Sequence, residues 1–145
     1  GTGRPVRFWD SSALVTLHVS QAATEAVREV YSSDPEVLGW VLSDVEMRSA
    51  LRRLEREGAL TGGDLAAAIS RAEDFWPTVN VIRLTDAVRA RAKRLLGVHP
   101  LRAADSLQLA AALVAFGDDP TGRGFVCLDA RLSAAALREG FTVLP

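Results

Sequence analysis

The chain has little cysteine and no long apolar run, and each of these shortages excludes a class of structure. Cys127 is the only cysteine in 145 residues, so an internal disulfide is excluded. It lies in the apolar run Phe125-Val126-Cys127-Leu128, far in sequence from any histidine or lysine that could activate it, which favours a buried, inert thiol. Because disulfides are rare in the cytoplasm, we expect the protein to act in that compartment.

No stretch approaches the roughly 20 apolar residues that cross a bilayer, and the N-terminus lacks the basic and apolar regions of a signal peptide. We therefore expect no membrane association. The composition, 48% hydrophobic and 24% charged, is typical of a globular protein. We interpret Gly1-Thr2-Gly3 as the remnant of an expression tag and residues 4–145 as one domain, which is long enough to bury a proper core.

Lysine is also scarce, and the net charge of −1 neither favours nor excludes a nucleic-acid partner. Lys93 is the only lysine among 17 basic residues; the others are arginines. Arginine suits bidentate contacts with phosphate better than lysine does. A GC-rich coding sequence is an equally good explanation of this bias.

Apolar periodicity and turn residues predict alternating strands and helices. Gly58, Gly97 and Gly140 are expected to end the helices that precede them, and the segment 102–116 has almost no polar face, so it should be largely buried. This alternation predicts an α/β fold, a three-layer α/β/α sandwich with a mainly parallel central sheet. The predicted strands are 6–9, 37–41, 79–84, 125–128 and 141–144, and the predicted helices are 12–19, 22–32, 44–57, 64–75, 86–96, 102–116 and 130–139.

Four acids, Asp10, Glu46, Asp105 and Asp129, each follow a predicted strand or lie in the first turn of a predicted helix. In a parallel sheet these positions share one edge, so the carboxylates can converge there. Two carboxylates about 5 Å apart repel by roughly 3 kcal/mol at an effective dielectric near 20, so without a cation one of them would hold its proton. Oxygen ligands without histidine or cysteine favour Mg²⁺ or Mn²⁺ over Zn²⁺.

Two of the acids have a helix-capping alternative that depends on neighbouring serines. Asp10 could cap the next helix, although Ser12 is available for that purpose, and we favour a functional role for Asp10. Ser12 could hold Asp10 or a metal-bound water, or it could be the cap. Ser43-Asp44-Val45-Glu46 matches a capping box with Ser43 as N-cap, so for Glu46 the cap and the metal role both remain open.

The other two acids also have structural alternatives. Asp105 suits the dipole at the start of its predicted helix, but a charge in so apolar a segment needs a partner, which favours a functional role. Asp129 could equally well cap the segment 130–139. The joint pattern is therefore stronger evidence for a metal site than any one of its members.

Each of the four acids lies in a longer motif. The segments are Phe8-Trp9-Asp10-Ser11-Ser12-Ala13-Leu14-Val15, Ser43-Asp44-Val45-Glu46-Met47-Arg48-Ser49-Ala50-Leu51, Leu101-Arg102-Ala103-Ala104-Asp105-Ser106-Leu107-Gln108-Leu109-Ala110, and Phe125-Val126-Cys127-Leu128-Asp129-Ala130-Arg131-Leu132 with Gly140-Phe141-Thr142-Val143. With these four segments the chain resembles a PIN domain, and in particular the VapC-type ribonuclease toxins of prokaryotic toxin–antitoxin pairs. The resemblance spans nearly the whole chain, and four motifs in order at family-like spacing are fairly specific.

The resemblance implies an endoribonuclease dependent on Mg²⁺ or Mn²⁺, a homodimer, and an antitoxin whose tail blocks the active pocket. It implies that the acidic pocket consists of Asp10, Glu46, Asp105 and Asp129, with Ser12 as an accessory polar group. The chain departs from the family at Cys127, where the family often has serine or threonine two residues before its fourth acid. This departure weakens the case for a polar helper beside Asp129.

Arginines near the four acids could hold RNA phosphates on either side of the cleaved bond. Arg53 is the best candidate, and Arg102, one turn before Asp105, could orient that acid, contact substrate or only be exposed. The other arginines of 44–57 are better interpreted as side chains on a solvent-exposed helix face that pair with neighbouring acids. The basic cluster Arg89, Arg91, Lys93 and Arg94 has the same ambiguity.

The favoured hypothesis is a metal-dependent endoribonuclease, in which a metal-bound water attacks the phosphorus and leaves a 5′-phosphate. One alternative is a phosphoacceptor signalling domain, but it needs a lysine at a late strand end, and Lys93 lies inside a predicted helix. Another is a domain that binds RNA without cutting it. The complete set of four acids argues against that alternative.

Overall fold

The computed structural model describes residues 6–145, and its centre is a five-stranded sheet in the order β3-β2-β1-β4-β5. Every pair of neighbouring strands is parallel, as predicted. The interpretation of Gly1-Thr2-Gly3 as a tag lies outside the described residues. The strands are β1 (Arg7–Trp9), β2 (Val37–Trp40), β3 (Asn80–Ile82), β4 (Gly124–Val126) and β5 (Thr142–Leu144).

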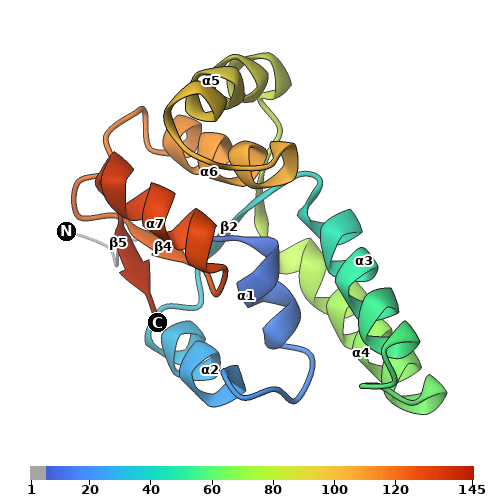
Figure 1. Ribbon diagram of the computed structural model, residues 1–145. Coiled ribbons are helices and arrows are strands. Elements are labelled where there is room, and N and C mark those ends of the chain that lie inside the picture. Colours follow the sequence, from blue (N-terminus) through green and yellow to red (C-terminus); the bar gives the residue numbers. More distant parts are fainter. Residues whose placement is uncertain (1–5) are drawn as a thin grey trace.

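Helices cover both faces of this sheet, which confirms the three-layer α/β/α architecture (Figure 1). Side chains alternate across a strand, so Phe8 and Trp9 of β1 enter different cores. Phe8 packs with α5, α6 and α7, whereas Trp9 packs with α1, α2, α3 and α4. The helices are α1 (Ser11–Thr16), α2 (Thr24–Ser33), α3 (Ser43–Arg56), α4 (Gly62–Phe75), α5 (Thr85–Val98), α6 (Ala103–Ala115) and α7 (Ala130–Glu139), with a short 3₁₀ turn at Trp76–Thr78.

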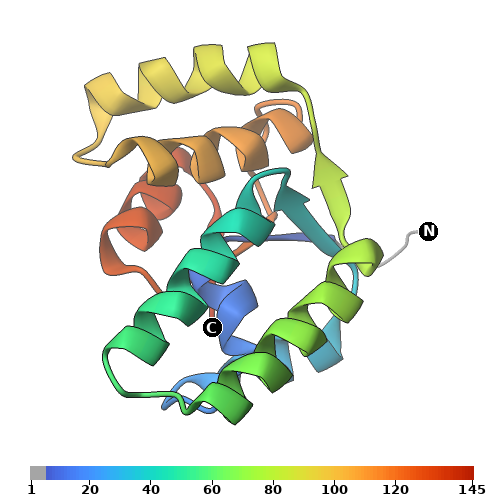
Figure 2. The same cartoon turned by 90° about the vertical axis from the view of Figure 1, so that its right-hand side faces the viewer.

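Two helix pairs lie side by side in both ribbon views, α3 with α4 and α5 with α6 (Figures 1 and 2). As its apolar sequence predicted, α6 is largely buried and has more buried residues than any other helix of residues 6–145, with Leu109–Leu113 within the core. No helix within residues 6–145 has both the length and the apolar character needed to cross a bilayer.

The prediction that Gly97 ends the fifth helix is wrong, because α5 continues to Val98. The chain leaves the helix at His99, which has extended backbone angles (φ −124°, ψ 148°). His99 precedes Pro100, and a proline disfavours the helical conformation in the residue before it. The proline therefore ends this helix, and the glycine is an interior helical residue.

The strand order determines where a site can form. From β1 the chain continues to β2 on one side of the sheet, and β4 lies on the other side of β1. Loops from the carboxyl ends of such neighbouring strands diverge and leave a crevice, which is the usual binding place in open α/β sheets. Asp10 follows β1, and Asp129 lies beyond the end of β4.

Candidate functional site

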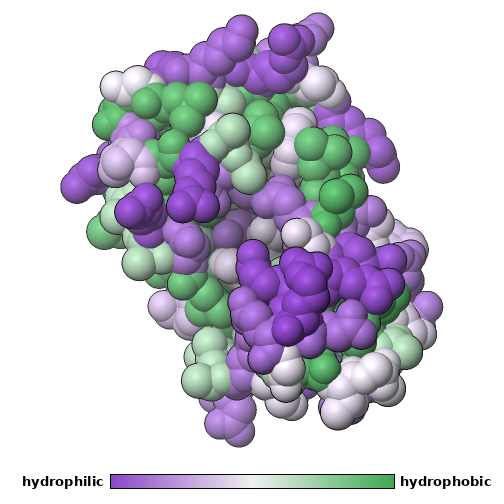
Figure 3. All heavy atoms as spheres, turned by 45° about the vertical axis from the view of Figure 1, so that its right-hand side comes forward, coloured by the Kyte–Doolittle hydropathy of each residue, from purple (hydrophilic) through white to green (hydrophobic). Residues whose placement is uncertain are grey.

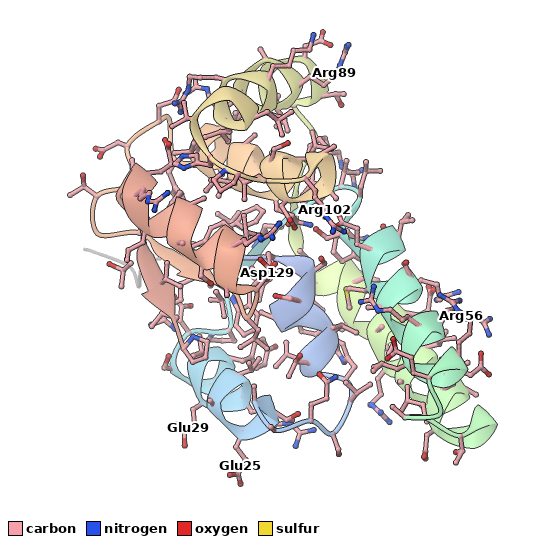
Figure 4. The ribbon with its side chains drawn as sticks, viewed as in Figure 1. Glu25, Glu29, Arg56, Arg89, Arg102 and Asp129 are labelled. Atoms are coloured by element: carbon pink, nitrogen blue, oxygen red, sulfur yellow. The ribbon has the colours of Figure 1, made fainter. Side chains whose placement is uncertain are left out.

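A pocket of about 580 Å³ lies at this crevice, and it collects side chains from distant parts of the chain. In the space-filling view, hydrophilic side chains gather around a hollow in the middle of the face (Figure 3). Figure 4 shows Arg102 and Asp129 near the amino ends of α6 and α7. All seven candidates from the sequence line this one pocket, namely Asp10, Ser12, Glu46, Arg53, Arg102, Asp105 and Asp129.

Asp10 is the most buried of the four acids, with 2% of its surface exposed. It is also the N-cap of α1, because the backbone N–H of Ala13 donates to its Oδ1 at 3.2 Å. Burial raises its pKa to about 6, although hydrogen bonds from Ser12 and Ala13 oppose the shift. Among residues 6–145 no arginine, lysine or histidine forms an ion pair with this carboxylate.

Ser12 does not cap α1; it connects the residue after β1 with the loop after β4. Its hydroxyl donates to Oδ1 of Asp10 at 2.7 Å and accepts a hydrogen bond from the backbone N–H of Leu128 at 3.0 Å. Asp10 follows β1, and Leu128 lies just beyond β4. Ser12 therefore fixes the Asp10 carboxylate relative to the loop that carries Asp129.

Glu46 does not take part in a capping box, so that alternative is wrong. The N-cap of α3 is Leu42, which makes no side-chain cap, and Ser43 already belongs to the first turn. Glu46 is therefore the fourth residue of the helix, whereas a capping box needs the glutamate at the third. Its two carboxylate oxygens accept other donors, Oε1 from the Ser11 hydroxyl at 3.2 Å and Oε2 from Nε2 of Gln108 at 3.0 Å.

The acids influence one another across the pocket. Burial raises the pKa of Glu46, and the charge of Asp105 raises it further. The hydrogen bonds that the Glu46 carboxylate accepts from Gln108 and Ser11 oppose this shift. Burial also raises the pKa of Asp105, the Asp129 carboxylate adds to that shift, and Arg102 and Arg131 oppose it. Such mutual repulsion indicates carboxylates that share one space.

Asp129 caps α7, because its Oδ1 accepts from the backbone N–H of Leu132 at 2.8 Å. The alternative raised for it from the sequence is therefore real. It does not remove Asp129 from the site, since an exposed side chain at this position lines the pocket as well. Cap and pocket wall are compatible roles for one carboxylate.

The arginines divide into paired and pocket-lining groups. Arg53 and Arg102 line the pocket and form no ion pair within residues 6–145. The others named from the sequence are mostly paired, as in Arg48 with Glu73 and Arg52 with Glu55. In the α5 cluster, Arg89 pairs with Asp86, Arg91 with Asp118 and Arg94 with Glu139.

Sequence patterns missed two residues of this site, Ser11 and Gln108, which hold the Glu46 carboxylate. The available signal for Gln108 was an amide one turn after Asp105 in an otherwise apolar helix. The buried thiol of Cys127, in contrast, matches its prediction, because burial raises its pKa to about 12. His99, between α5 and α6, is buried, with Nε2 2.6 Å from Oε2 of Glu139.

The donor chemistry of the pocket fits a hydrated hard cation. Within residues 6–145 no three histidine, cysteine or acidic side chains lie close enough to enclose a metal ion by themselves. Mg²⁺ does not require such a cage, because it usually keeps several waters and binds through one or two carboxylates. Asp10, buried without a cationic partner, and the half-buried Glu46 and Asp105 supply ligands of the right type.

Comparisons with known proteins agree with this arrangement. The PIN domain model matches residues 7–115. Ribonuclease VapC45 of Mycobacterium tuberculosis is 33% identical over 141 residues, which cover 97% of this chain and 96% of the relative. Among solved structures, a toxin–antitoxin complex from Klebsiella pneumoniae superposes with a TM-score of 0.66 at 13% identity, covering 94% of this chain and 96% of the other.

A second structure, M. tuberculosis VapC20, described as a sarcin–ricin loop cleaving toxin, gives a TM-score of 0.65 at 20% identity over 97% of this chain and 99% of that one. These structures share the fold, and VapC45 is similar to this chain in sequence along almost its whole length. The resemblance seen in the four acidic segments is thereby confirmed. The chain belongs to the PIN domain family, where its relatives are VapC ribonucleases.

Proposed function

We propose that the protein is a metal-dependent endoribonuclease toxin that cuts RNA phosphodiester bonds at the acidic pocket and is neutralised by an antitoxin. The observation that carries the proposal is the convergence of Asp10, Glu46, Asp105 and Asp129 on one pocket, with no ion pair to Asp10. Relatives named ribonucleases at 33% identity support the reaction class.

Asp10, Glu46 and Asp105 would hold Mg²⁺ or Mn²⁺, with Asp129 nearest to solvent. When bound, the cation would lower the pKa of a coordinated water and stabilise charge on the phosphate. The protein's own part is to orient the carboxylates through Ser11, Ser12 and Gln108. The backbone N–H of Leu128, in the loop after β4, donates to the Ser12 hydroxyl. Through Ser12, this loop therefore helps to orient the Asp10 carboxylate.

Arg53 and Arg102 are the proposed phosphate ligands. They come from different elements of the pocket wall, Arg53 from α3 and Arg102 from the N-cap position of α6, and neither forms an ion pair among the described residues. Two guanidinium groups beside the acids would bind phosphates of the RNA backbone near the cleaved bond. It would also offset the repulsion between the acids and the phosphates.

A partner is proposed as well. A structure with the same fold is a toxin–antitoxin complex, and we propose that an antitoxin tail covers the acidic pocket of this chain in the cytoplasm. A homodimer, which the family resemblance implied, is also part of the proposal. Sedimentation of the purified protein, alone and with a candidate antitoxin, would test the dimer and the complex.

The reaction is tested by incubating total cellular RNA with the protein in Mg²⁺ or Mn²⁺, and by repeating the incubation in EDTA. We expect cleavage products with 5′-phosphate ends that are absent in EDTA and absent with Asp10→Asn. The matched control is Asp74→Asn, an exposed acid of α4 outside the pocket, which should cleave as the parent does. Binding of RNA without cleavage would overturn the proposal and leave an RNA-binding domain.

A further inference from the structure

Gln108 is a buried amide in the most apolar helix of the protein. Only 1% of its surface is exposed, and the residues that follow it, Leu109–Leu113, are all in the core. Burying an amide is costly unless its hydrogen bonds are made, and a leucine here would continue the apolar run. We therefore expect the buried amide of Gln108 to make specific hydrogen bonds that an apolar side chain could not make.

The hydrogen bonds of Gln108 point to that purpose. Its Nε2 donates at 3.0 Å to Oε2 of Glu46 and at 3.0 Å to the hydroxyl of Ser43, so both N–H groups have acceptors. Both acceptors belong to α3, whereas Gln108 belongs to α6. Ser43 is itself fully buried, and it holds the amide in place for its bond to the carboxylate.

This bond connects two of the acids through one helix. Asp105 and Gln108 lie three residues apart on α6, so their side chains project from neighbouring positions on the helix surface. The same helix thus carries one acid of the pocket and holds the carboxylate of another. Ser11 donates to the remaining oxygen of Glu46 at 3.2 Å and is adjacent to Asp10 in the chain, which extends the connection to the third acid.

A neutral donor is well suited to this task. A lysine or arginine in place of Gln108 would form an ion pair with Glu46, and its charge would repel a divalent cation in the pocket. An amide fixes the carboxylate without adding charge. From this geometry we propose that Gln108 is a positioning residue that orients Glu46 toward the pocket and thereby increases the affinity of the pocket for a divalent cation; this rests on the proposed function.

The test measures Mn²⁺ binding to the full chain without RNA, by electron paramagnetic resonance of free Mn²⁺. The variant Gln108→Met keeps length and approximate volume but removes both donors. We expect its affinity for Mn²⁺ to fall about tenfold, as is typical when a residue that holds a metal ligand is lost. Gln108→Asn, too short to reach Glu46, should lose a similar factor and serves if the methionine variant does not fold.

A double-mutant cycle separates positioning from a general structural effect. In a Glu46→Gln background, adding Gln108→Met should lower the affinity for Mn²⁺ by less than about twofold, because Gln108 acts through the Glu46 carboxylate. Equal losses in both backgrounds, or an unchanged affinity in a folded Gln108→Met variant, would overturn the inference alone. A parent chain that binds no Mn²⁺ at all would overturn the proposed metal site and this inference with it.

Discussion

Asp10 and Asp129 follow neighbouring strands, β1 and β4, and each caps the helix that comes next in the chain, yet their surroundings differ. Asp10 is 2% exposed and is held by Ser12, whereas Asp129 is exposed and its Oδ1 is bound to the N–H of Leu132. A carboxylate that is fixed and shielded from water interacts more strongly with a cation than an exposed one does. The two acids should therefore contribute unequally to the reaction.

We predict that Asp10→Asn lowers the rate of RNA cleavage at least about 100-fold and Asp129→Asn about tenfold or less. Asparagine caps a helix as well as aspartate does, so Asp129→Asn should change the free energy of unfolding by less than about 0.5 kcal/mol. Single-turnover cleavage assays and urea unfolding test the two parts. Equal loss of rate in both variants would show that burial does not rank these acids.

His18 gives the protein a pH dependence unrelated to the pocket. It is 6% exposed, its ring lies edge-on to Phe75 at 5.1 Å between centroids, and its Nε2 has no hydrogen-bond partner among the described residues. Burial, with the charges of Arg71 and Arg28, lowers its pKa from 6.5 to about 4. The folded protein therefore contains a neutral imidazole over a pH range in which the unfolded chain would be protonated.

Because the unfolded state binds this proton between pH 6.5 and about 4, stability should fall as the pH falls through that window. At 1.36 kcal/mol for each pH unit, the contribution is about 3 kcal/mol once the pH reaches the lower end. Between pH 7.5 and pH 4.5 the parent should lose about 2–3 kcal/mol more than His18→Leu in urea unfolding. Parallel pH profiles of the two proteins would contradict this.

For single residues, the sequence predicted which side chains meet in one pocket but not the hydrogen bonds that hold them there. Asp10, Glu46, Asp105 and Asp129 could be selected because strand and helix ends share an edge in a parallel sheet. The bond from Gln108 to Glu46 joins positions 62 residues apart, and no local pattern encodes such a contact. The capping box failed for a related reason, since moving the start of α3 by one residue changes which side chains can meet.

The ends of the helices were harder to predict than their interiors, because a helix end depends on a local backbone conformation that composition alone does not reveal. Gly58 and Gly97 look alike in sequence, but Gly58 has a φ of +77° beyond the end of α3, whereas Gly97 lies within α5. Strands and helix interiors were predictable because apolar periodicity extends over many residues. A glycine is ambiguous by itself, and here the proline that follows His99 determined the outcome.

The same two glycines provide a matched pair of variants. At neither position would an added Cβ meet a non-neighbouring atom within 4 Å. The effect of an alanine on stability therefore depends only on the backbone conformation. Gly97→Ala should raise the free energy of unfolding by about 0.5–1 kcal/mol, the helix propensity difference. Gly58→Ala should lower it by about 1 kcal/mol, because alanine disfavours a positive φ. Thermal and urea unfolding of both variants test the signs, and a stabilising Gly58→Ala would contradict the assignment.

For the molecule as a whole, the pocket couples binding to folding. Its walls come from positions 10 to 129, so an unfolded chain cannot assemble them. A ligand that binds only the folded state stabilises it, by about 2.7 kcal/mol at 100 times its Kd. We predict that saturating Mn²⁺ raises the Tm of the parent and of Asp74→Asn, that EDTA reverses the rise, and that Asp10→Asn shows little of it. An equal rise in Asp10→Asn would place the ion elsewhere.

The proposal that the acidic pocket binds a divalent cation is tested most directly by the anomalous scattering of Mn²⁺ in crystals of the parent chain. We predict a strong peak in the pocket, within reach of Asp10 and at least one of Glu46 and Asp105, and no such peak in Asp10→Asn. A saturated crystal with an empty pocket, or with its peaks only at exposed acids elsewhere, would contradict it.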